Sequence, residues 1–231
     1  MKTIGLLGGM SWESTLEYYR IINQTVKARL GGSHSAQCLL YSVDFAEIEP
    51  LQHAGQWEKL TQVMLTAVGR LEQGGADCLV ICTNTMHRMA DAIQSATPLP
   101  LLHIADATAA AIKTQGLQTV GLLGTRFTME GSFYRGKLEH EHGLRVLIPD
   151  DAGREVVHKV IYDELIHGVI REESRRAYLE VIANLLADGA QGVILGCTEI
   201  SLLIQQKDVG LPVFDTTSLH AQAAVEWVLK A

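Results

Sequence analysis

The sequence predicts an α/β protein built from two similar units, each with a parallel β-sheet. Short apolar runs alternate along the chain with longer segments whose apolar residues recur at helical spacing. Continuous apolar runs bounded by helices are typical of parallel strands covered on both faces. The order of these segments also repeats after more than a hundred residues, which indicates an internal duplication.

The first half of the sequence contains the alternating strands and helices that this fold class requires. Residues 3–9, TIGLLGG, predict a buried strand followed by a glycine turn. Residues 12–32 predict a helix, because their apolar residues have helical spacing and the pattern stops at two glycines. A second strand is expected over residues 38–45, a second helix over 57–76 and a third strand over 77–83.

The second half repeats the first in three ordered matches. IGLLGG aligns with VGLLGT at an offset of 116 residues, GGADCLVICTNT with DGAQGVILGCTE at 114, and LPLLH with LPVFD at 112. Small loop deletions would produce such a drift. We therefore expect a first domain of residues 1–112 plus 213–231 and a second domain of residues 113–212, with the last segment returning to the first unit.

Composition and charge exclude several classes of protein. The chain has 231 residues, of which 47% are apolar, and a formal charge of −7. This acidic balance argues against a nucleic-acid partner. No apolar run reaches the ~18 residues of a membrane helix, and the start lacks the apolar core of a signal peptide, so we expect a cytoplasmic protein. The four scattered cysteines have no CxxC spacing, which argues against disulfides and against a metal site.

Polar residues and glycines follow four of the predicted strands. Ligands of open α/β sheets bind outside the carboxyl ends of the strands, and two facing units would bring these segments to one cleft. The candidates are Gly8, Gly9, Met10 and Ser11; Thr83, Asn84 and Thr85; Gly124, Thr125 and Arg126; and Cys197, Thr198 and Glu199. Each has a structural alternative, as a turn, a helix cap or a solvated surface residue.

The repeat also assigns the cysteines. The offset of 114 places Thr83 opposite Cys197, and Cys82 opposite Gly196. A shift of one residue turns a strand side chain to the other face, so Cys82 is expected to pack beside the site. A helix start after Cys197 would lower its thiol pKa. His87, one helical turn beyond Thr83, is expected to be structural.

The segments IGLLGGMSWEST, TNTMH, VGLLGTRFTM, IYDEL and LGCTEI, in this order, resemble the aspartate/glutamate racemase family over essentially the whole chain. The resemblance implies two α/β domains related by a pseudo-twofold axis, with the active site in the cleft between them. It also implies catalysis without a cofactor, and a homodimer. Two family cysteines, in C-N-T and G-C-T-E motifs, flank the substrate: one thiolate removes the Cα proton and the opposite thiol returns one.

This chain keeps the G-C-T-E motif but reads T-N-T in the other. By the resemblance, Cys197 is the base that acts on L-aspartate or L-glutamate, and Thr83 or a water that it holds protonates the second face. An alcohol is a poor base, so we expect preference for the L enantiomers. The expected substrate-binding residues are Met10, Gln52, Asn84, Thr85, Thr125, Thr198 and Glu199. No lysine of the matched motifs could anchor pyridoxal phosphate.

Two other functions remain open from the sequence. A site with one thiol also suits a decarboxylase of a malonate-like acid, as in the wider superfamily. The chain could instead be a non-catalytic binding protein for an acidic metabolite. The polar set around the matched motifs favours an amino-acid substrate over an aryl acid.

Overall fold

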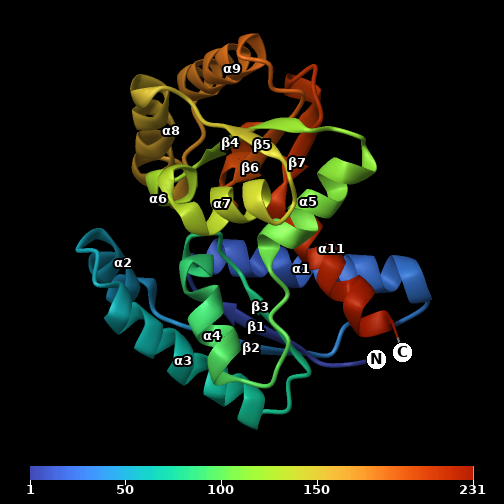
Figure 1. The fold of residues 1–231 in the computed structure, drawn as a ribbon. Helices are drawn as coiled ribbons and strands as arrows, with labels where there is room; N and C mark the ends of the chain where they lie inside the picture. The colour runs from blue at the N-terminus through green and yellow to red at the C-terminus, as the bar shows by residue number, and fades with distance from the viewer. Residues whose placement is uncertain (231) are drawn as a thin grey trace. The chain divides into compact units, whose positions relative to one another are not determined.

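The computed structural model describes residues 1–230, which divide into two compact units (Figure 1). The first unit comprises Met1–His103 together with the segment that begins at His220. The second unit comprises Ile104–Leu219. Each unit has its own sheet and its own hydrophobic core.

The first unit contains a three-stranded parallel sheet. Its strands are β1 (Ile4–Gly8), β2 (Cys38–Ser42) and β3 (Cys78–Ile81), in the spatial order β2-β1-β3. The central strand β1 is buried along its whole length, as its unbroken apolar pattern predicts. Leu101 adds a single parallel bridge to Leu79 beyond β3.

Helices cover both faces of this sheet. The elements are α1 (Trp12–Leu30), α2 (Phe45–His53), α3 (Trp57–Gln73), the 3₁₀ turn η1 (Thr85–Met89), α4 (Ala90–Ala96) and most of α11 (Thr216–Leu229). Alternate strand residues point to opposite faces, so two cores form. Leu7 and Leu79 pack with α3 on one face, whereas Leu6 and Val80 pack with α1 and α11 on the other.

The second unit repeats this sheet with one more strand. Its strands are β4 (Thr119–Gly124), β5 (Arg145–Leu147), β6 (Val193–Gly196) and β7 (Val213–Asp215), in the order β5-β4-β6-β7, and all pairs are parallel. The first strand of each unit is thus central, and the segment LPVFD supplies β7 where LPLLH supplies only the bridge at Leu101.

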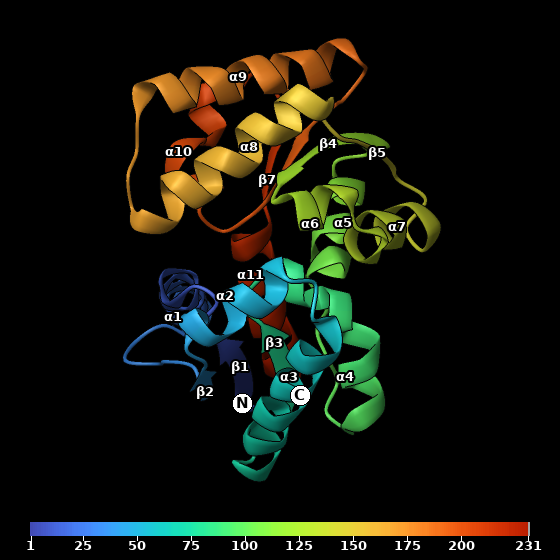
Figure 2. The ribbon, with the colours of Figure 1, turned by 90° about the vertical axis from the view of Figure 1, so that its left-hand side faces the viewer.

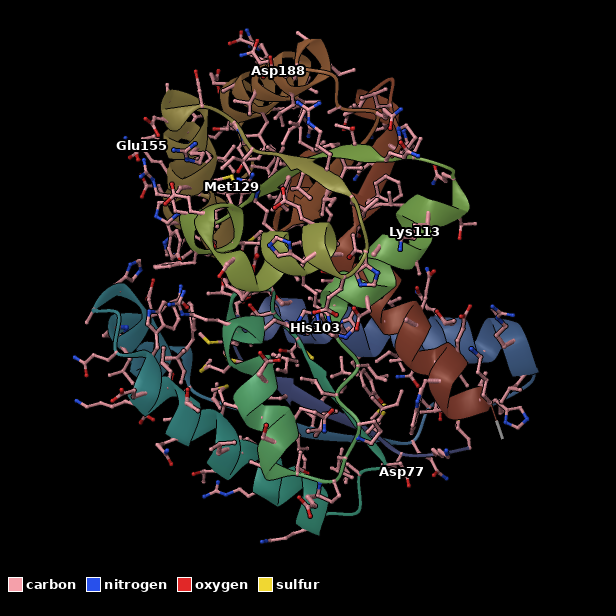
Figure 3. All side chains as sticks on the ribbon, in the orientation of Figure 1. Asp77, His103, Lys113, Met129, Glu155 and Asp188 are labelled. Carbon is pink, nitrogen blue, oxygen red and sulfur yellow. The ribbon has the colours of Figure 1, made fainter. Side chains whose placement is uncertain are left out.

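The helices of the second unit surround one large core (Figure 2). They are α5 (Ile104–Thr114), α6 (Arg126–Glu130), α7 (Ser132–His140), α8 (Asp151–Asp163), η2 (Leu165–His167), α9 (Glu172–Ala187), α10 (Ile200–Leu203) and η3 (Gln206–Asp208). Met129 of α6 lies inside this core and Glu155 of α8 lies outside it (Figure 3).

The unit boundaries differ from those expected from the sequence, which were 112/113 and 212/213. Helix α5 belongs to the second unit, because Ile104, Ala109 and Ile112 pack into the second core. Strand β7 also stays with the second unit, because it pairs with β6. Sequence repeats mark equivalent segments, whereas a compact unit is delimited by side-chain packing.

A matched pair of hydrogen bonds repeats in the two units. The hydroxyl of Tyr18 lies 2.8 Å from Nδ1 of His220 on α11. The hydroxyl of Tyr134, its counterpart in the repeat, donates to Oγ1 of Thr108 on α5 at 3.2 Å. His220 and Thr108 are themselves counterparts at the 112-residue offset. The duplication therefore extends to buried polar contacts.

Among residues 1–230, no helix combines the length and the apolar character that crossing a membrane requires.

Candidate functional site

Hydroxyl groups of the cap and the first turn of α1 stabilise the glycine turn after β1. Gly9 has a φ of +91°, and a Cβ there would overlap the backbone of Val43. The amide of Gly9 donates to Oγ1 of Thr15 at 2.8 Å. Ser11 caps α1 by accepting from the amide of Ser14 at 3.3 Å. Met10, a predicted binding residue, is buried in this turn.

The two residues after β3 have different surroundings. Cys82 is fully buried in the core that contains Leu6, Val80 and Tyr18, and burial raises the pKa of its thiol. Thr83, the next residue, is only partly buried. The alternation of strand faces explains this difference, and it leaves Thr83 as the side chain at the strand end.

A neutral histidine holds the backbone of Thr83. Nδ1 of His87 lies 2.8 Å from the carbonyl oxygen of Thr83, so this nitrogen carries the proton and donates it. The His87 ring packs against the rings of His103 and His220 at centroid distances of 4.6 and 5.6 Å (Figure 3 labels His103). Burial, followed by these two histidines, lowers the pKa of His87 well below its usual value. His87 thus has the structural environment that was expected for it.

The other predicted residues of the first unit are buried. Asn84 and Thr85 begin η1, a 3₁₀ turn that leads into α4. Asn84 occupies the N-cap position without a capping side-chain hydrogen bond, so the simple cap interpretation of this motif does not hold. Gln52 is also buried, but it lies on α2 and does not follow a strand.

In the second unit, β4 and β6 end side by side. Gly124 pairs with Gly196, and a Cβ on Gly124 would lie 2.9 Å from the carbonyl oxygen of Gly196. The segments that follow these two glycines therefore begin at the same edge of the sheet, on neighbouring strands. Thr125 caps α6 by accepting from the amide of Thr128 at 3.3 Å.

Arg126 follows Thr125 and has two carboxylate neighbours. Its guanidinium donates to Glu155 at 2.9 Å and lies 3.7 Å from Glu130. The side chain is 39% exposed, which fits the surface ion-pair alternative for this residue.

Cys197 follows β6 and donates a hydrogen bond from its thiol. Its Sγ lies 2.9 Å from Oε2 of Glu199, and Oγ1 of Thr198 donates to the same oxygen at 2.7 Å. Glu199 is buried. The geometry describes a protonated thiol beside a carboxylate that accepts two hydrogen bonds.

The protonation of Cys197 corrects the expectation of a low thiol pKa. Cys197 is partly buried, and this loss of solvent, followed by the charge of Glu199, raises the pKa of its thiol well above the usual value. The backbone hydrogen bonds from Thr198 and Glu199 lower this pKa, but their effect is smaller than the increase. The following helix α10 has only four residues, so its start adds little positive field.

Comparison with known proteins identifies the family. The family model described as Asp/Glu/hydantoin racemase matches residues 7–224. The chain belongs to this racemase family.

Two solved structures and one curated protein are similar to this racemase over nearly their whole length. A crystal structure described as a candidate Asp/Glu racemase from Yersinia pestis is 57% identical, covers 100% of both chains and has a TM-score of 0.94. An aspartate racemase homologue from Pyrococcus horikoshii is 34% identical over 98% of this chain and 99% of that one, with a TM-score of 0.86. The broad specificity amino-acid racemase RacX of Bacillus subtilis is 22% identical over 98% of each chain.

The predicted family resemblance and the α/β fold with two parallel sheets are therefore confirmed, and the protein is an isomerase. Within residues 1–230, no group of three or more histidine, cysteine or acidic side chains is arranged to hold a metal ion.

Two residues of this racemase were not assigned from the sequence: Tyr178, whose phenol interacts with the charge of Cys197, and Glu164, which lies near Tyr178. Tyr178 of α9 is fully buried and donates to the carbonyl of Val157 at 2.8 Å. Burial, followed by the charges of Cys197, Glu164 and Glu199, raises the pKa of its phenol well above the usual value. Glu164 accepts from Ser174 at 2.6 Å. The motif IYDEL contains Glu164 and was the available signal, whereas Tyr178 had none.

Proposed function

We propose that this protein is a cofactor-independent racemase of aspartate or glutamate, in which Cys197 removes the Cα proton of the L enantiomer. The observation that carries the proposal is the hydrogen bond from the Cys197 thiol to Glu199 at the end of β6. It gives the thiol a proton acceptor at the strand end where ligands of this fold class bind.

The thiol must lose its proton before it can act as a base. Glu199 accepts that proton along the existing 2.9 Å hydrogen bond, so the pair keeps a single negative charge. The resulting thiolate then takes Hα from the substrate and becomes a thiol again, and Glu199 gives its proton to solvent before the next turnover. Because a second negative charge beside Glu199 is unfavourable, the two groups act as one unit that shares a proton.

In this proposal Thr83 supplies the proton to the second face of the carbanion. Its hydroxyl, or a water that it holds, gives a proton to the carbanion on the side opposite Cys197, and solvent then restores that proton. An alcohol donates a proton to a carbanion more readily than it removes one from carbon. The L enantiomers should therefore react faster than the D enantiomers, although each step remains reversible.

The remaining residues are proposed to bind the substrate. Amide and hydroxyl groups can hold the α-carboxylate and orient Cα, and Met10 can contact the aliphatic part. The set is Met10, Gln52, Asn84, Thr85, Thr125 and Thr198, and all of these except Thr198 are buried. Catalysis without a cofactor, a homodimeric state and a cytoplasmic location stay predictions.

The test is Hα exchange in deuterated water with L-aspartate and L-glutamate. Cys197→Ala should abolish exchange while circular dichroism shows the fold retained. Cys82→Ala is the matched control, because Cys82 lies in the core and should leave exchange near the wild-type rate. Undiminished exchange in Cys197→Ala would exclude the mechanism.

One observation favours a second candidate, a decarboxylase of a malonate-like acid. Only one of the two matched positions carries a thiol, and a single proton donor suffices for protonation after loss of carbon dioxide. Release of carbon dioxide from a substituted malonate, without Hα exchange of amino acids, would support this candidate. Tight binding of an acidic metabolite with neither reaction would indicate a binding protein.

A further inference from the structure

The imidazole of His87 is directed at the backbone of the segment that carries Thr83. Its Nδ1 donates to the carbonyl oxygen of Thr83 at 2.8 Å, four residues earlier in the chain. The backbone carbonyls of Thr83 and Asn84 both raise the pKa of His87, against the larger decrease that burial causes, because each points a negative oxygen at the ring. All three residues belong to the first unit. One side chain therefore restrains two consecutive peptide groups.

This restraint acts where the segment has no other side-chain cap. Thr83 follows β3, and Asn84 stands at the N-cap of η1 without a capping side-chain hydrogen bond. Threonine is branched at Cβ and has few χ1 rotamers, and the rotamer that it favours depends on its backbone dihedrals. By fixing the Thr83 peptide group, His87 also fixes the direction of the Thr83 hydroxyl.

The second unit restrains its own motif from the matching position. The offset of 114 residues pairs His87 with Ser201 and Asn84 with Thr198. The hydroxyl of Ser201 donates to the carbonyl oxygen of Thr198 at 2.9 Å. A serine that bonds back along its helix is common, whereas a buried imidazole is a large polar group that costs free energy unless it is hydrogen-bonded. The first unit therefore uses the costlier group at this position.

A second buried histidine in the same cluster has different hydrogen-bond partners. The ring of His87 lies 4.6 Å from that of His103 and 5.6 Å from that of His220, between centroids. Nδ1 of His220 lies 2.8 Å from the hydroxyl of Tyr18, and its Nε2 lies 2.7 Å from the carbonyl oxygen of Leu102. His220 thus serves packing within the unit, and it provides a matched comparison for His87.

We propose that His87 is a positioning residue of this racemase, which holds Thr83 so that the hydroxyl can deliver a proton to the second face of the carbanion. This inference rests on the proposed function and deepens it. His87 neither contacts the substrate nor transfers a proton; its Nδ1 proton stays in the hydrogen bond to the Thr83 carbonyl. Loss of that donor should impair only the Thr83 face, because Cys197 belongs to the other unit.

The two faces can be measured in one reaction. In deuterated water, Cys197 removes Hα from L-aspartate or L-glutamate, and its thiol exchanges that proton for solvent deuterium. Return of the deuteron by Cys197 gives the α-deuterated L enantiomer, whereas delivery from the Thr83 side gives the D enantiomer. Both products come from the same carbanion, so their ratio is independent of the amount of folded protein and of substrate affinity. Chiral chromatography with mass spectrometry measures this ratio of inversion to retention.

Four variants separate positioning from packing. Thr83→Val sets the ratio without the hydroxyl. His87→Leu, which removes the donor, should lower the ratio at least about tenfold, because a misplacement of ~1 Å can cost ~10²-fold. His87→Asn should recover most of the wild-type ratio, because its side-chain amide nitrogen takes the place of the imidazole Nδ1. His220→Leu is the matched control and should leave the ratio near the wild-type value, even where it lowers stability.

Nitrogen NMR of the imidazole gives a second measurement that does not depend on activity. It should find the His87 proton on Nδ1, and a proton on Nε2 alone would overturn the inference. The inference also fails if His87→Leu keeps the wild-type ratio, if His220→Leu lowers it equally, or if His87→Asn does not recover it. A wild type that exchanges no Hα of the L enantiomers would instead overturn the proposed function, and with it the step that His87 is proposed to assist.

Discussion

Replacement of Glu199 by glutamine tests whether the carboxylate controls the protonation of Cys197. The change keeps the shape of the side chain and an oxygen that can accept from the Cys197 thiol, which lies 2.9 Å from Oε2 in the wild type. It removes the negative charge, and with it the group that accepts the thiol proton in the proposed mechanism. The Cys197 pKa should therefore fall, although burial, the larger cause of its elevation, remains.

The magnitude follows from the distance. Two unit charges 2.9 Å apart repel by about 6 kcal/mol at an effective dielectric constant of about 20. That repulsion opposes ionisation of Cys197 as long as Glu199 stays charged. Since 1.4 kcal/mol corresponds to about tenfold in an equilibrium constant, the variant should contain far more thiolate at neutral pH, and alkylation should accelerate at least about tenfold.

The assay is the rate of Cys197 alkylation by iodoacetamide against pH, with modification located by mass spectrometry. The alkylation profile and the alkaline limb of Hα exchange should both move to lower pH in Glu199→Gln. Glu164→Gln is the control, because Glu164 acts on Tyr178 but is not among the causes of the Cys197 pKa elevation. An unchanged profile in Glu199→Gln, or an equal shift in Glu164→Gln, would refute the reasoning.

Three further predictions concern both units. Thr83→Cys should raise exchange of D-aspartate and D-glutamate by ~10²–10⁴-fold, because a positioned acid–base group contributes that much; equal D and L exchange by the wild type would contradict it. Tyr178→Phe should lower the unfolding free energy by about 1 kcal/mol in urea titrations, because the Val157 carbonyl loses a buried donor. Burial raises the pKa of Cys78 to about 12. In the unfolded chain the Cys78 thiol loses its proton near pH ~8.5, whereas in the folded protein it keeps that proton to higher pH. The free energy of unfolding should therefore be unaffected by this thiol below pH ~8.5 and should fall by about 1.4 kcal/mol per pH unit above it. Cys78→Ala should flatten this alkaline slope.

The sequence by itself determined the class of fold and the order of its elements. Unbroken apolar runs such as IGLLG and VGLLG become the buried central strands β1 and β4, because a strand covered by helices on both faces needs no polar alternation. The repeat placed Thr83 opposite Cys197, and strand alternation predicted the burial of Cys82. These conclusions depend on local periodicity and on the internal repeat, and the order of residues records both directly.

Only the tertiary structure decided the state of the candidate site and the limits of the units. Helix α5 joins the second core, which no repeat indicated. Tyr178 reaches the surroundings of Cys197 from α9, nineteen residues earlier in the chain, and so carried no sequence signal. The thiol pKa was expected to be low and is instead raised. Electrostatic energy depends on the distance between charges and on their burial, and both arise only when the chain has folded.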